Sequence, residues 1–134
     1  MKSLRDKALK NGYAEYVSEP VYLCGYCMSP GIALEKPDSV VKLCALLCLH
    51  KGEMDDVLLW PFEHKIKLSI IHPQPKPERQ LELKPFRTLE NYVKPISPSN
   101  QPALFLTPSL NLADLWRDGY VSEDQLRVKW EVLP

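Results

Sequence analysis

The sequence has no surplus of charge of either sign and no long apolar run. Its 134 residues include seventeen basic and seventeen acidic side chains, so the charge balance favours neither nucleic acid nor an anionic membrane as a partner. No apolar stretch approaches the roughly 20 residues that span a bilayer. Residues 1–7 are charged and lack the apolar core of a signal peptide. We therefore expect one cytoplasmic domain that neither binds nucleic acid nor inserts into a membrane.

Sequence patterns of catalysis are also scarce. The three histidines, His50, His64 and His72, are not linked by HxxxH or HExxH spacing. No serine or cysteine is flanked by the glycine pair of a nucleophile elbow. A Cys–His dyad stays open at this point, because its members would meet in space rather than in sequence. We expect a protein that is not an enzyme.

The four cysteines suggest an alternative in which a bound metal stabilises the domain. Cys24 and Cys27 form a C-x₂-C pattern, and Cys44 and Cys48 form a C-x₃-C pattern further along the chain. This spacing overlaps that of zinc sites, so a zinc-stabilised domain with these four cysteines as ligands is one alternative. Against it, a strand would hold Cys44 and Cys48 about 13 Å apart. We expect free, buried thiols in a reducing compartment, with no metal and no cofactor.

Glycine is rare in this chain and proline is common. Five glycines accompany thirteen prolines, and eight of the prolines lie between residues 73 and 108. This density excludes long helices there and favours short strands joined by stiff loops. We expect an all-β antiparallel β-sandwich of seven to eight strands with one short helix. The expected strands span residues 13–17, 22–34, 40–50, 65–71, 81–83, 103–107 and 125–132, and the helix spans residues 112–117 after an Asn111 N-cap.

Three local patterns sharpen this expectation. Pro30 falls inside the second expected strand, which predicts a bulge or an edge position. Residues 40–50 form a continuous apolar run, which predicts a strand covered on both faces, whereas residues 65–71 alternate and predict a strand with one face in water. The Trp60-Pro61-Phe62 sequence predicts a stiff corner whose two aromatic side chains fill the core.

Several motifs together resemble one known family. They cover residues 18–133 and include a Gly-Glu-x-Asp segment leading into the Trp-Pro-Phe corner, a proline-spaced patch and a final turn with its strand. This order resembles the meprin and TRAF homology domain (MATH/TRAF-C) of the tumour necrosis factor receptor-associated factors. We expect residues 1–17 to form an N-terminal arm or partial strand and residues 18–134 to form the domain. The matching residues are Gly25-Tyr26, Gly52, Glu53, Asp55, Leu58, Trp60, Pro61, Phe62, Leu83-Lys84-Pro85, Tyr92-Val93-Lys94-Pro95 and the segment 120–128.

The resemblance implies a TRAF-like adaptor or scaffold that binds a peptide or protein segment, such as a receptor tail or a signalling adaptor. Many members act in signal transduction associated with ubiquitin ligases. Members form trimers through a coiled coil, so an oligomer of that kind would need a segment that is not present in this chain. A structural sandwich without a ligand groove is the remaining alternative. No match exists for the family's first strand, which leaves a possible open sheet edge.

The resemblance also places a peptide groove, although the residues there depart from the family pattern. Gly31 and Ala33 occupy positions where the family carries an arginine or a tyrosine, and other aligned positions hold leucine where serines or aromatic residues are usual. We therefore expect apolar rather than acidic partner segments. The expected peptide-binding residues are Gly31, Ala33, Leu89, Glu90, Asn91, Leu104 and Leu106.

Overall fold

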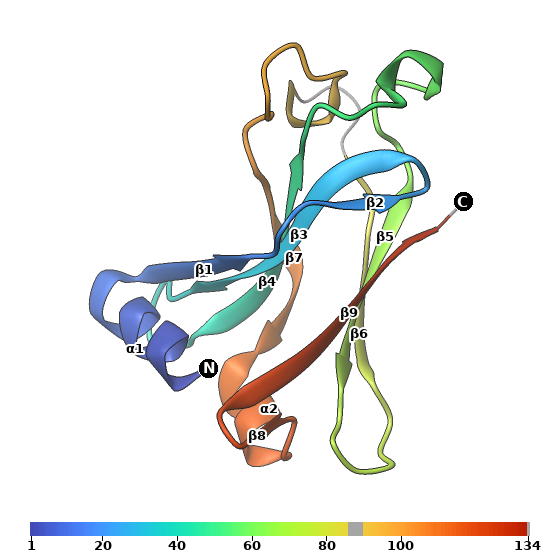
Figure 1. Cartoon of the computed structure of the whole chain (residues 1–134). Coiled ribbons are helices and arrows are strands. Elements are labelled where there is room, and N and C mark those ends of the chain that lie inside the picture. Colours follow the sequence, from blue (N-terminus) through green and yellow to red (C-terminus); the bar gives the residue numbers. More distant parts are fainter. Residues whose placement is uncertain (86–89, 134) are drawn as a thin grey trace.

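Two antiparallel sheets pack face to face in the computed structural model of the chain, which describes residues 1–85 and 90–133 (Figure 1). The first sheet has the order β1-β3-β4-β7, and β2 also pairs with β3. The second sheet has the order β6-β5-β9-β8. The all-β sandwich expected from the sequence is confirmed. The strands are β1 (Tyr13–Val17), β2 (Val21–Leu23), β3 (Tyr26–Glu35), β4 (Lys42–Leu49), β5 (Lys65–Ile71), β6 (Arg79–Leu83), β7 (Ala103–Asn111), β8 (Val121–Ser122) and β9 (Gln125–Leu133).

Two α-helices and two 3₁₀ turns complete the described part of the chain. Helix α1 (Lys2–Asn11) forms the N-terminal arm and ends at Gly12. Helix α2 (Leu112–Arg117) begins after Asn111, whose side-chain oxygen accepts a hydrogen bond of 2.9 Å from the Ala113 N–H. This contact satisfies one of the donors that every helix leaves unpaired at its start. The 3₁₀ turns are η1 (Asp55–Val57) and η2 (Glu90–Tyr92).

The single strand expected over residues 22–34 is instead a hairpin of β2 and β3, so that expectation was wrong. The two-residue turn between them consists of Cys24 (φ 51°) and Gly25 (φ 87°). Two successive positive φ angles define the tight turn whose twist matches paired strands. Cysteine rarely occupies such a position, so the turn has little signal in the sequence.

Pro30 lies in a central strand, not at an edge or a bulge as expected. It is opposite Leu47 of β4, and its carbonyl accepts a hydrogen bond of 3.0 Å from the Ser18 N–H. The Pro30 nitrogen therefore points to the same side of β3 as this carbonyl. On that side β1 ends at the residue opposite Gly31, and β2 begins at the residue opposite Met28. Because no strand residue pairs there, the missing N–H of proline removes no ladder bond.

The core lies between the two sheets and follows the alternation of the strands. In β5, Ile66, Leu68 and Ile70 are fully buried, as their spacing predicted. All residues of β4 after Lys42 are buried, which confirms that this strand is covered on both faces.

The two aromatic side chains of the Trp60-Pro61-Phe62 corner are buried to different extents. Phe62 is fully buried, and Trp60 is partly buried and packs against the core cluster, so the corner contributes to the core as expected, although its two aromatic side chains do so unequally.

Candidate functional site

The outer face of the first sheet, turned away from the core, is apolar and crosses three strands. Leu46 of β4 is opposite Gly31 of β3 on one side and opposite Leu104 of β7 on the other. Neighbouring residues such as Ala45 and Leu47 belong to the central core cluster, so Leu46 and its two partners point to the opposite face. We call these outward positions the β3–β4–β7 face: Gly31, Ala33, Cys44, Leu46, Cys48, Leu104 and Leu106.

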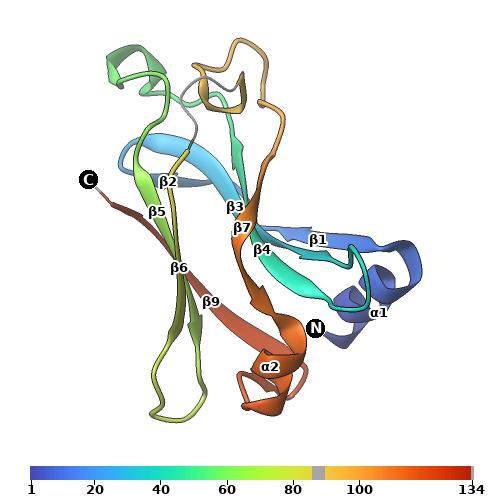
Figure 2. The same cartoon turned by 180° about the vertical axis from the view of Figure 1, so that it is seen from behind.

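The β7 side of this face ends in a free strand edge. Strand β7 is the last strand of the first sheet and pairs only with β4 in the described part of the chain. Figure 2 shows β7 and β6 on the side of the sandwich that faces the viewer. Leu104 is 37% exposed and Leu106 is 53% exposed, whereas Leu46 beside them is 2% exposed. Leu104 and Leu106 on this unpaired edge strand therefore offer both main-chain and apolar contacts to an extended segment.

Prolines limit the length of this free edge. Pro102 precedes β7, and Pro108 interrupts it, and neither residue has an N–H to donate. The β4 pairing is also irregular between Leu43 and Ala45, where the register shifts. The regular part of the free edge is therefore the stretch 103–107, long enough for a short segment only.

Gly31 is required by the close approach of β1. A Cβ atom on this residue would lie 2.4 Å from the Tyr16 carbonyl oxygen, a distance that real Cβ atoms do not adopt. Ala33, next to it on the same face, is fully buried and opposite Cys44. The positions at which the sequence resemblance implies a large polar side chain are therefore filled by the smallest residues and cannot accept more.

The structure brings some of the expected site residues together and separates others. Gly31, Ala33, Leu104 and Leu106 share the β3–β4–β7 face. Asn91 lies in η2, and its side-chain amide donates to the carbonyls of Gln101 (2.9 Å) and Pro102 (3.1 Å) just before β7. It therefore acts as a brace for the start of β7. Glu90, also in η2, is exposed, and Leu89 lies outside the described residues.

Leu46, Cys44 and Cys48 are buried members of this face that sequence reasoning did not assign to it. They lie in a continuous apolar run, which gives no sign of which side chains point to the core. Burial raises the pKa of the Cys44 thiol to about 11 and also raises that of Cys48. Both thiols are therefore protonated at neutral pH and act as small apolar side chains.

The zinc alternative finds no geometric support. Cys44 and Cys48 are opposite Ala33 and Ser29, respectively, so they are separated along an extended strand by about 13 Å. Cys24 is exposed in the β2–β3 turn, with its sulfur 3.9 Å from the Val132 carbonyl oxygen. Within residues 1–85 and 90–133, no three His, Cys, Asp or Glu side chains gather as a metal site would require.

One Ser–His contact resembles part of a catalytic dyad. Ser29 Oγ lies 2.6 Å from His50 Nε2, and Ser99 Oγ lies 2.6 Å from His50 Nδ1. Ser29 is 2% exposed, so a substrate has no access to its hydroxyl. The His50 backbone also forms a bridge with Ser99. These contacts connect β3, the end of β4 and the segment that leads into β7, which is a structural role.

The fold and the free apolar edge together define a β-sandwich of the kind that serves protein interactions. Residues 14–129 match the family described as TRAF/meprin, MATH domain, and the chain belongs to this family. Among solved structures, TRAF5 of Notothenia coriiceps is similar in fold, with a TM-score of 0.70 and 19% sequence identity, over 98% of this chain and 79% of that chain. No curated protein sequence matches the chain. In the described part of the chain, neither helix has the length and apolar character needed to cross a bilayer.

Proposed function

We propose that this chain is a non-catalytic protein-interaction module that binds an extended segment of a partner along β7, on the β3–β4–β7 face. The observation that carries this proposal is the pair of half-exposed leucines, Leu104 and Leu106, on an unpaired edge strand beside buried Leu46. Membership of the TRAF/meprin MATH family, whose domains bind proteins, supports the same conclusion.

The mechanism that suits this edge is addition of a strand. The main-chain groups of residues 103–107 that face away from β4 would bond to the partner's backbone, which supplies affinity without reading its sequence. Alternate side chains of the partner would then lie over Leu104 and Leu106, which supplies the preference for apolar residues. The prolines on both sides restrict the docked segment to a few residues.

The chemistry of the face favours apolar over acidic segments. Its outward positions on β3 and β4, from the Ser29–Cys48 pair to the Ala33–Cys44 pair, include no cationic side chain. An acidic receptor-tail peptide would find no charge-assisted donor there, and such hydrogen bonds are worth roughly 1.5–3 kcal/mol each. Losing two of them weakens binding by about two to four orders of magnitude. Exposed Glu90 in η2 adds like charge near the start of β7.

The test is a comparison of variants with a partner segment selected from a peptide array. Leu104→Asp and Leu106→Asp each should weaken binding by at least about tenfold in calorimetry, because a buried carboxylate opposes apolar contact. Val57→Asp is the matched control, since Val57 is 72% exposed in η1, outside this face. Micromolar binding of acidic tail peptides, or equal losses in all three variants, would contradict the proposed site. Absence of any bound peptide would favour a structural sandwich without a ligand groove.

Membership of the family supports a proposal for the cellular setting. We place the module in the cytosol, as an adaptor in receptor signalling associated with ubiquitin ligases, with a receptor tail or another adaptor as its partner. We also place the domain at residues 18–134, preceded by the arm. Any trimer formed through a coiled coil would depend on a segment outside this chain.

A further inference from the structure

A pocket of about 370 Å³ lies between α1 and α2, beside the loop of residues 36–41 that joins β3 to β4. In Figures 1 and 2 both helices lie in the lower half of the view. We call this the α1–α2 pocket and define it by Arg5, Val40, Val41, Leu112 and Trp116. Among the described residues, its lining includes none of β9 and none before Arg5. Its volume is at the lower end of the range of ligand sites, about 300–1,000 Å³.

Apolar side chains make up most of this lining, and hydrogen bonds fix the walls. Leu112 is buried, and Val41 and Trp116 are partly buried against the core. The Leu112 N–H donates to the Val41 carbonyl (3.0 Å), which joins the first turn of α2 to the β3–β4 loop. The Val40 N–H donates to Asp38 Oδ1 (3.0 Å), which holds the loop in a turn. The pocket is therefore formed before any ligand enters it.

Arg5 is the charged side chain of the pocket. Its guanidinium carbon lies 4.3 Å from the centroid of the Trp116 ring, so the face of the ring holds the guanidinium in place. Within residues 1–85 and 90–133, this guanidinium donates no hydrogen bond, and its enclosed Nε has no partner. Asp6 Oδ1 lies 3.8 Å from Nε, which is an ion-pair contact too long for a hydrogen bond. The donors of Arg5 are therefore left without an acceptor.

The carboxylates on the adjoining elements are engaged elsewhere. Asp114 of α2 pairs with Arg117 at 3.2 Å, and Asp38 accepts the Val40 N–H. Neither carboxylate lines the pocket. A guanidinium that is fixed on an aromatic ring, beside an apolar pocket and without an acceptor, is complementary to an anionic oxygen from outside the chain.

We propose that the α1–α2 pocket binds a carboxylate that carries an apolar group. The carboxylate oxygens accept from the Arg5 guanidinium, and the apolar group lies against Val40, Val41 and Leu112. One cation balances the single charge of a carboxylate, whereas a phosphate, with a charge of about −2, would keep uncompensated charge beside Asp6. A carboxylate group alone would leave the apolar lining uncovered, so the ligand needs an apolar part. This proposal goes beyond the binding proposed for β7 and does not depend on it.

NMR of the isotopically labelled full chain, titrated with isocaproate, tests the proposal. We expect saturable shifts of the Val41 and Ala113 amides and of the Trp116 indole N–H, with a dissociation constant of about 10 mM or tighter. Isocaproamide has nearly the same shape but no charge, and acetate has the charge but no apolar group. Each should bind at least about tenfold more weakly than isocaproate.

A free organic acid and the C-terminus of a peptide with an apolar last residue present the same groups to the pocket. A short peptide that ends in leucine, compared with its C-terminal amide, distinguishes these two sources. Tighter binding of the free-acid peptide than of isocaproate would support the pocket as a reader of protein C-termini. Binding of isocaproate but not of the peptide would support it as a site for a free organic acid.

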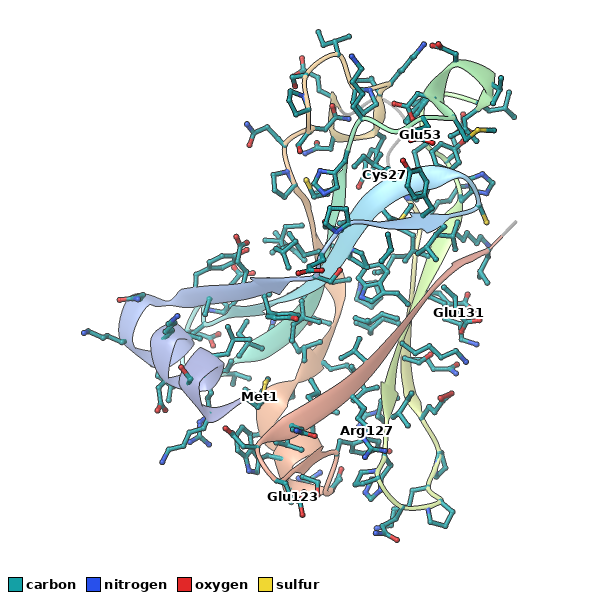
Figure 3. The ribbon with its side chains drawn as sticks, viewed as in Figure 1. Met1, Cys27, Glu53, Glu123, Arg127 and Glu131 are labelled. Carbon is teal, nitrogen blue, oxygen red and sulfur yellow. The ribbon has the colours of Figure 1, made fainter. Side chains whose placement is uncertain are left out.

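Variants of Arg5 test the cation. Arg5→Gln should weaken isocaproate binding at least about tenfold, and Arg5→Lys should restore part of the affinity, because lysine keeps the charge but not the planar fork. Arg127→Gln is the matched control, since Figure 3 shows Arg127 on the side of β9 turned away from α1. It should leave the affinity within about twofold of the natural chain.

A second variant leaves Arg5 and its contact with Trp116 intact. Ser39 is exposed and lines the pocket, so a carboxylate at this position would engage the guanidinium without disturbing the core. Ser39→Asp should weaken isocaproate binding at least about tenfold, whereas the neutral Ser39→Asn should stay within about twofold of the natural chain. Thermal melts of all variants show whether each one is folded.

Three results would each overturn the proposal. They are a dissociation constant for isocaproate weaker than about 10 mM, equal affinity for isocaproate and isocaproamide, and undiminished binding by folded Arg5→Gln or Ser39→Asp. Leu104→Asp on β7 should leave isocaproate binding unchanged, which separates this test from that of the proposed function.

Discussion

Phe62→Ala should destabilise the fold more than Trp60→Ala, although the two residues flank the same proline. Phe62 is fully buried and meets the Tyr26 ring edge-on at 4.8 Å. Truncating a buried phenylalanine costs about 3–5 kcal/mol, through lost burial and the cavity that remains. Trp60 also meets the Tyr26 ring edge-on, with centroids 5.1 Å apart, but it is only partly buried, and its indole N–H donates to the Asp55 carbonyl at 2.8 Å. We expect Trp60→Ala to cost about 2–3 kcal/mol.

Urea unfolding followed by circular dichroism measures both free energies. A domain of this size is stable by about 5–15 kcal/mol, so Phe62→Ala can fall below the range in which a folded baseline exists. Phe62→Leu provides a measurable second variant, with an expected loss of about 1–2 kcal/mol, because it keeps most of the buried volume. If Trp60→Ala lowered the free energy of unfolding as much as Phe62→Ala or more, this reasoning would be refuted. The indole would then be the side chain of the corner that contributes most to stability.

Two further predictions concern the first sheet. Because burial raises the pKa of Cys44 from 9.0 to about 11, the unfolded chain loses this proton first, and the free energy of unfolding should fall by up to about 3 kcal/mol as the pH rises between these values. Urea unfolding should show a smaller fall in Cys44→Ala, and an equal fall would contradict this. Gly31→Ala should cost about 2–4 kcal/mol, because its Cβ would lie 2.4 Å from the Tyr16 carbonyl oxygen. Gly12→Ala is the comparison variant in thermal melts. It should cost only about 1 kcal/mol of stability, from backbone strain at φ 80°, because its Cβ would have no atom within 4 Å.

The features that were predictable from sequence are those that depend on neighbours along the chain. The alternation in β5 fixes which side chains enter the core, because successive side chains of a strand point to opposite faces. The Asn111 cap was found for the same local reason, because its own side chain satisfies a donor at the start of the helix.

The features that were missed depend on partners distant in sequence. Pro30 looked like an edge residue until the gap between β1 and β2 was known, and that gap is a property of two other strands. The unequal burial of Trp60 and Phe62 depends on where Tyr26 of β3 lies. In each case the local pattern was interpreted correctly, but the position of its partner decided the outcome.

The candidate site is the clearest example of this limit. Gly31, Leu46 and Leu104 come from three separate strands and meet only through the pairing register. The resemblance to the family indicated Gly31, Ala33, Leu104 and Leu106, whereas Leu46 between them was hidden in an apolar run. A one-residue change of register would turn Leu46 into the core, so composition alone does not define this face.

The β7 edge is short, bracketed by prolines and bordered by leucines, so it accepts a brief apolar segment and resists extended pairing.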